Sequence, residues 1–139
     1  MVTWLLGAPP PARWNLLRAT FDPGGFRRWL VNWDAVAAWT LHRVEREALA
    51  TGDREALALR DELLAMPGVD PSWARADWRV PGELLLPLHV RKDGVELRVF
   101  TALTTFGTPL DVTVSELRVE CYFPADDPTR AVLDALKTG

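Results

Sequence analysis

Two runs of alternating apolar residues, joined by Asp93-Gly94, constrain the fold more than any other part of the chain. The apolar positions are Leu84, Leu86, Leu88 and Val90 in the first run, and Val95, Leu97 and Val99 in the second. Such alternation indicates strands, and Asp-Gly suits the two positive φ angles of a tight hairpin turn. A third run changes phase near Ser115-Glu116, which predicts a β-bulge or a strand break. The sequence therefore predicts an antiparallel β-meander with strands at residues 84–92, 95–105 and 112–123.

The residues before the meander show helical periodicity instead. The clearest stripe has apolar residues at positions i, i+4, i+7 and i+11: Ala37, Leu41, Val44 and Ala48. It predicts a helix over residues 34–50, with Asn32 or Asp34 as the N-cap. Similar signals predict further helices at residues 12–20, 26–30 and 54–66, after Asp70-Pro71, and after Asp127-Pro128. Helices followed by a meander predict one α+β domain spanning residues 1–139.

Composition and charge exclude several classes of protein. The formal net charge is −3, so no global basic field attracts nucleic acid. The single Cys121 rules out an internal disulfide and fits a reducing cytoplasm. Met1 to Leu6 lacks the basic start of a signal peptide, and no apolar run approaches the roughly 18 residues of a membrane span. We expect a cytoplasmic protein that neither binds DNA by itself nor enters a membrane.

The residues that could carry chemistry have simpler interpretations. His42 and Glu45 could share one helical face, but no further ligand follows at metal-binding spacing, so a solvent-facing histidine is favoured. The same interpretation applies to His89. Cys121 belongs to the apolar set of its strand and has no predicted base beside it, which favours a small buried residue. The sequence predicts no catalytic residue, metal or cofactor, and hence no enzyme.

Seven tryptophans against one tyrosine are unusual for a chain of this length. Trp29, Trp33 and Trp39 cluster before and on the longest predicted helix. They are explained either by core packing or by the wall of a pocket for an apolar ligand, because both need large rigid rings.

An ordered series of short motifs resembles one known family. The motifs are Asn15-Leu16-Leu17-Arg18 with Phe21 and Asp22-Pro23, then Asn32-Trp33-Asp34, Trp73-Ala74-Arg75 with Asp77, Leu103 through Pro109, and Phe123-Pro124-Ala125-Asp126. From about Trp4 to Leu136, the series resembles the C-terminal ligand-binding domain of MmyB-like transcription regulators, within the XRE-type helix-turn-helix proteins.

The resemblance implies a PAS-like sensor, in which helices cover one side of an antiparallel sheet around an apolar pocket. It implies a hydrophobic small molecule, such as a fatty acid, as the ligand. Family members contact DNA through an N-terminal domain absent from this chain, and two strands usually precede the segment matched by Trp4 to Gly7. An open sheet edge would then favour a homo-oligomer, since open edges pair.

The resulting hypothesis places a fatty-acid-like molecule between sheet and helices. The sheet would supply the floor: Leu86, Leu88, Leu97 and Val99, with Phe100 as an alternative on the other phase. The helices would supply part of the roof: Trp33, Trp39 and Leu41. A carboxylate would need a cation near the mouth, either Arg43 or Arg98.

Two other functions remain open from the residues. One is a protein–protein interaction or dimerisation module without a small ligand, which would have a filled core and an apolar outer patch. The other is a small hydrolase or isomerase, which would need a titratable group inside a cavity.

Overall fold

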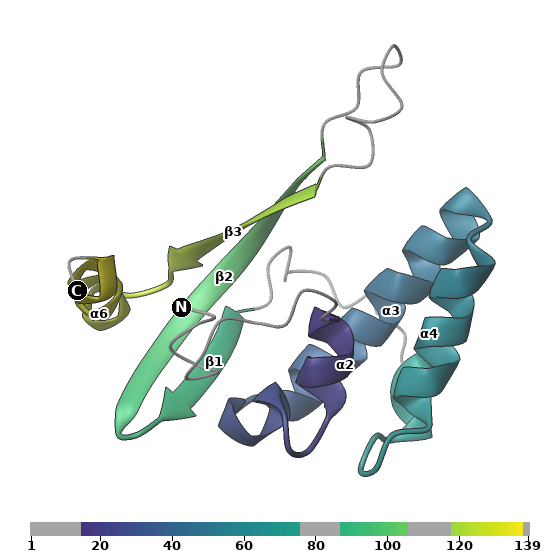
Figure 1. Cartoon of the computed structure of the whole chain (residues 1–139), viewed down its shortest axis with the longest axis horizontal. Coiled ribbons are helices and arrows are strands. Elements are labelled where there is room, and N and C mark those ends of the chain that lie inside the picture. Colours follow the sequence, from purple (N-terminus) through teal and green to yellow (C-terminus); the bar gives the residue numbers. More distant parts are fainter. Residues whose placement is uncertain (1–14, 76–86, 106–117, 138–139) are drawn as a thin grey trace.

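A computed structural model describes residues 15–75, 87–105 and 118–137 (Figure 1). These ranges contain a three-stranded antiparallel sheet with most of the helices on one side and the last helix on the other, so the predicted α+β class is confirmed, while the PAS-like likeness stays a prediction. The elements are α2 (Leu16–Phe21), the 3-10 helix η1 (Phe26–Trp29), α3 (Trp33–Thr51), α4 (Arg54–Leu64), the 3-10 helix η2 (Pro71–Arg75), β1 (Pro87–Lys92), β2 (Val95–Thr105), β3 (Arg118–Pro124) and α6 (Asp127–Lys137).

The sheet has the predicted meander order, β1-β2-β3. Asp93 and Gly94 have φ angles of 51° and 77°, as a two-residue hairpin turn requires. Register pairs Leu88 with Val99 and Val90 with Leu97. Because strand residues alternate, these four share one side, which we call the inner face. The opposite side, the outer face, carries His89, Arg98, Phe100 and Phe123. Leu86 and the expected bulge near Ser115-Glu116 lie outside the described residues.

The two longest predicted helices are confirmed within a few residues at each end. Gly52 ends α3 with a φ of 71°, in the left-handed region that glycine adopts without a steric penalty. Asp53 then caps α4, and its Oδ1 accepts the N–H groups of Glu55 and Ala56 at 2.9 and 3.1 Å. This sharp turn folds α4 back along α3 (Figure 1).

Two apolar clusters hold the elements together. The helical core comprises Phe21, Ala37, Leu41, Leu63 and Val69. The sheet core comprises Phe26, Val90 and Leu97, with residues such as Trp29, Leu88 and Val132 packed against it. Therefore α2 contributes Phe21 to one cluster, while η1 contributes Phe26 to the other.

Asn32 has an unexpected partner. It occupies the N-cap position of α3, as one of the two predicted caps, but its side chain caps no helical N–H. Its Oδ1 instead accepts the backbone N–H of His89 at 3.0 Å, and the Val31 N–H donates to the His89 carbonyl at 2.8 Å. Leu30 also forms an isolated antiparallel bridge with Val90. The chain entering α3 thus covers part of the free edge of β1.

The first turn of α6 takes the place of β3 where β3 ends. The Arg98 N–H donates to Thr129 Oγ1 at 2.9 Å, and the Ala125 N–H donates to the Arg98 carbonyl at 2.8 Å. Thr129 is only 1% exposed, and its own N–H donates to Asp126 Oδ1 at 2.8 Å. The Thr129 bonds and the charges of Arg98 and His89 lower the pKa of Asp126. The N–H and the carbonyl of Arg98 thereby have hydrogen-bond partners, although Arg98 lies beyond the last residue pair of β2 and β3.

Replacing Thr129 with valine tests this substitute pairing. Thr129→Val keeps the shape of the side chain but leaves the Arg98 N–H without its acceptor. We therefore expect the free energy of unfolding to fall by about 1–3 kcal/mol. Urea denaturation followed by circular dichroism measures the change. Thr129→Ser retains the hydroxyl and should lose less; equal losses for the two variants would assign the effect to packing of the methyl group.

Candidate functional site

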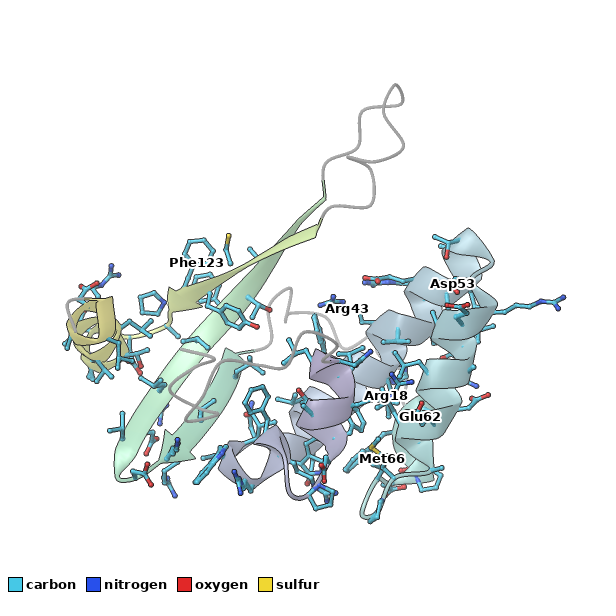
Figure 2. The ribbon with its side chains drawn as sticks, viewed as in Figure 1. Arg18, Arg43, Asp53, Glu62, Met66 and Phe123 are labelled. Atoms are coloured by element: carbon cyan, nitrogen blue, oxygen red, sulfur yellow. The ribbon has the colours of Figure 1, made fainter. Side chains whose placement is uncertain are left out.

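One stripe of α3 is distinct from the side that packs in the helical core. It has residues at i, i+4, i+7 and i+11: Val36, Thr40, Arg43 and Glu47. We call it the sheet-side stripe, because Figure 2 shows one of its residues, Arg43, on the side of α3 nearest the sheet. Val36 and Thr40 are 3% and 7% exposed, so the N-terminal half of the stripe is covered. A molecule lying between α3 and the sheet would meet these side chains.

Arg43 brings a positive charge to this stripe. Its side chain is 25% exposed, and its Nε donates to Glu47 Oε1 at 3.2 Å. The guanidinium carbon lies 5.3 Å from the centre of the Trp39 ring, within range of a cation–π contact. Figure 2 shows Arg43 projecting from α3 on the side nearest the sheet. A guanidinium has five N–H donors, and the bond to Glu47 uses only the one on Nε, so Arg43 has the donors to bind another carboxylate.

The inner face of the sheet supplies the apolar surface on the other side. Leu97 and Val99 are completely buried. Phe26 already covers Leu97 in the sheet core. Among the described residues, Val99 belongs to neither the helical core nor the sheet core. The face continues beyond Val99 into the half-buried pair of Thr101 and Tyr122. The inner face therefore continues past the residues that Phe26 covers.

The structure separates the ten predicted site residues into several places. Leu88, Leu97 and Val99 lie on the inner face, Trp33 and Leu41 in or against the helical core, and Arg43 on the sheet-side stripe with Trp39 beside it. Arg98 and Phe100 lie on the outer face, opposite Leu97 and Val99, while Leu86 is outside the described residues. Sequence reasoning missed Val36 and Thr40, although their spacing of seven and three residues before Arg43 signalled a shared stripe.

Trp33 has the surroundings of a core residue. Its ring makes edge contacts with Phe21 and Trp73, at centroid distances of 5.0 and 6.3 Å. The Arg27 guanidinium lies 4.5 Å above the ring and donates to the Pro67 and Gly68 carbonyls. The Trp33 Nε1 atom is buried without a hydrogen-bond partner among the described residues. Core packing thus explains the ring and leaves this donor available.

His42 is less exposed than the sequence suggested. Its Nε2 atom is buried and has no hydrogen-bond partner in the described part of the chain, so the prediction of a solvent-facing ring is wrong for that atom. The reason is the position of His42 on α3, on the same side as Glu45, which pairs with Arg60 of α4.

A charged group occupies the outer face near the hairpin. The Glu96 carboxylate contacts His89 Nε2, Arg91 Nη2 at 3.2 Å and Arg98 Nη2 at 3.5 Å. The hydrogen bond from His89, followed by that from Arg91, holds the pKa of Glu96 below its ordinary value near 4.5. Arg98 is therefore engaged on the side of the sheet that faces away from Leu97 and Val99.

The described residues offer no group of three or more His, Cys, Asp or Glu side chains arranged to hold a metal ion. Over the same ranges, none of the helices combines the length and apolar character needed to cross a bilayer.

The charge network around Glu96 predicts a pH effect. His89→Ala removes the main cause of the lowered pKa, so the pKa of Glu96 should rise toward its ordinary value in an NMR titration. A lowered folded-state pKa contributes stability that is present above the unfolded pKa and lost as pH falls through the folded pKa. His89→Ala should therefore flatten the loss of stability below about pH 4.5, the ordinary value. Arg130→Gln, outside the network, is the control; an unchanged Glu96 titration in His89→Ala would contradict the assignment.

Comparison with known proteins identifies the family. The family described as the MmyB-like transcription regulator ligand binding domain matches residues 1–136. No curated protein and no solved structure matched the chain. The match covers nearly the whole chain and confirms the resemblance seen in the ordered sequence motifs. The chain belongs to the MmyB-like transcription regulator ligand binding domain family.

Proposed function

We propose that this chain is the cytoplasmic sensor of a transcription regulator and that its ligand is a hydrophobic small molecule of the fatty-acid type. Family membership gives the regulatory ligand-binding class. One observation carries the finer proposal: the sheet-side stripe of α3 runs from buried Val36 to half-buried Arg43, which projects on the side of α3 nearest the sheet (Figure 2). An apolar surface ending at a cation suits an alkyl chain ending in an acid.

The position of the ligand follows from what is already covered. Phe26 packs on Leu97, so an alkyl chain would lie beyond it, against Val99 and between the sheet and Val36 and Thr40. Leu88, Leu97, Leu41 and Trp33 would support this site from behind rather than line it throughout. Each buried methylene contributes about 0.8 kcal/mol, so a chain of medium length reaches micromolar affinity after association and ordering costs.

Signalling would then act through the helices that adjoin the ligand. We assign DNA contact to a separate domain of the regulator, because this chain carries a net charge of −3. A ligand beside α3 would alter how α3 sits on the sheet, and the hydrogen bond from His89 to Asn32 joins those two parts.

The proposal is tested with saturated fatty acids of increasing length. Trp39, which is 36% exposed beside Arg43, should report binding through intrinsic fluorescence. Binding should saturate, and each added methylene should tighten it by up to about fourfold until the site is full. Acetate is the control, because it carries the acid without the chain. A flat response at every length would contradict ligand binding of this type.

A specific observation also favours the second candidate function, self-association. Phe123 is 44% exposed and stacks on Phe100 on the outer face, with ring centroids 5.3 Å apart. Figure 2 shows Phe123 on the side of the sheet away from α2, α3 and α4. We propose that this aromatic pair is the centre of a homodimer contact, since a two-fold axis would bury each Phe123 against the partner's copy of the patch.

Sedimentation velocity tests the dimer. The chain should sediment as a dimer at micromolar concentrations, and Phe123→Ser should shift it toward monomer by removing apolar contact area. Leu49→Ser, at a position that is 68% exposed on α3, is the matched control and should leave the dimer intact. A monomeric wild-type chain would rule out the proposal.

A further inference from the structure

We propose that Arg43 is the residue that binds the ligand carboxylate, and that Glu47 is an internal counterion which this carboxylate displaces. The inference rests on the proposed function and deepens it: it names the residue that recognises the acid group and the residue that the acid group replaces. The site would then select fatty acids over neutral lipids of the same length.

Arg43 and Arg98 differ in whether their side chains can reach a ligand on the inner face of the sheet. Arg98 projects from the outer face, is 56% exposed and contacts Glu96 there. Its backbone is fixed by Thr129 and Ala125, so β2 cannot rotate to bring its side chain to the inner face. Arg43 lies on the same stripe as Val36 and Thr40, which would meet the alkyl chain.

Other arginines near the helical core are held by contacts between elements. Arg18 donates through both Nε and Nη2 to Glu62 of α4, each at 2.7 Å. Arg27 donates to the carbonyls of Pro67 and Gly68 and stacks on Trp33. Using either cation for a ligand would release a connection between helices.

The pair formed by Arg43 and Glu47 is suited to exchange. Both residues lie on α3, and the contact runs through Nε alone at 3.2 Å rather than through two parallel bonds. The order with the base before the acid is the less favourable one for an i, i+4 pair. Glu47 is 37% exposed, so its carboxylate can return to water when another carboxylate takes its place.

Trp39 would keep the arginine in position during this exchange. The guanidinium carbon lies 5.3 Å from the centre of the ring, and we expect this contact to persist when one carboxylate replaces the other. A stacked guanidinium loses little freedom when it gains a new acceptor, because its plane is already oriented. The contact with Trp39 therefore favours carboxylate recognition by a planar guanidinium over recognition by the ammonium group of a lysine.

The test compares a saturated fatty acid with the fatty alcohol of equal length, by calorimetry on the whole chain. Arg43→Gln should weaken acid binding about tenfold and leave alcohol binding unchanged. Glu47→Gln should tighten acid binding about twofold, because the competing carboxylate is gone. Arg43→Lys keeps the charge without the fork and should fall between Arg43→Gln and wild type. Arg46→Gln, on the same helix, is the matched control.

The outcomes separate the two proposals. If neither acid nor alcohol binds the wild-type chain, the proposed function fails. If both bind, but Arg43→Gln leaves acid binding unchanged or weakens both ligands equally, the inference alone is overturned. A loss in Arg98→Gln without one in Arg43→Gln would assign the carboxylate to the outer face. Weaker acid binding in Glu47→Gln would show that Glu47 orients Arg43, which overturns the exchange.

Discussion

The turn between α2 and η1 is the connection on which the described fold depends. It allows two phenylalanines, five residues apart, to enter different cores: Phe21, fully buried, among the helices, and Phe26, 7% exposed, against the sheet. The turn is tight enough that a Cβ on Gly25 would lie 2.2 Å from the Ala19 carbonyl oxygen. Only glycine fits such an approach without a backbone shift. The helix pair and the sheet are therefore joined by a segment whose geometry one residue controls.

A second connection fixes the start of α3 but leaves the rest of that helix less constrained by the sheet. The bonds from His89 to Asn32 and from Val31 to His89 join β1 to the residues before α3. Arg43 and Glu47 lie about three and four turns further along the helix, where no such backbone link to the sheet occurs in the described residues. A ligand at the proposed site would act on the part of α3 that lies away from this anchored end.

Local signals in the sequence were sufficient for the elements but not for their partners. Asp93-Gly94 and the alternation around it gave the hairpin, and the stripe from Ala37 to Ala48 gave α3, because both patterns reflect backbone geometry. The partner of Asn32 is 57 residues away and that of Thr129 is 31 residues away, and neither leaves a periodic trace. For the same reason, the choice between Arg43 and Arg98 as the cation of the proposed site required the register of β2, which places Arg98 on the outer face.

The charged pairs of this chain divide by what they connect. Arg18 joins α2 to α4 through Glu62, and Arg60 joins α4 to α3 through Glu45, so each pair holds two elements in place. The pair of Arg43 and Glu47 connects two turns of one helix, so opening it breaks no contact between Arg43 and another element. An ion pair of this kind can respond to a ligand without weakening the fold. Because regulation needs a contact that changes while the core does not, the pair that contributes least between elements is the one best placed for recognition.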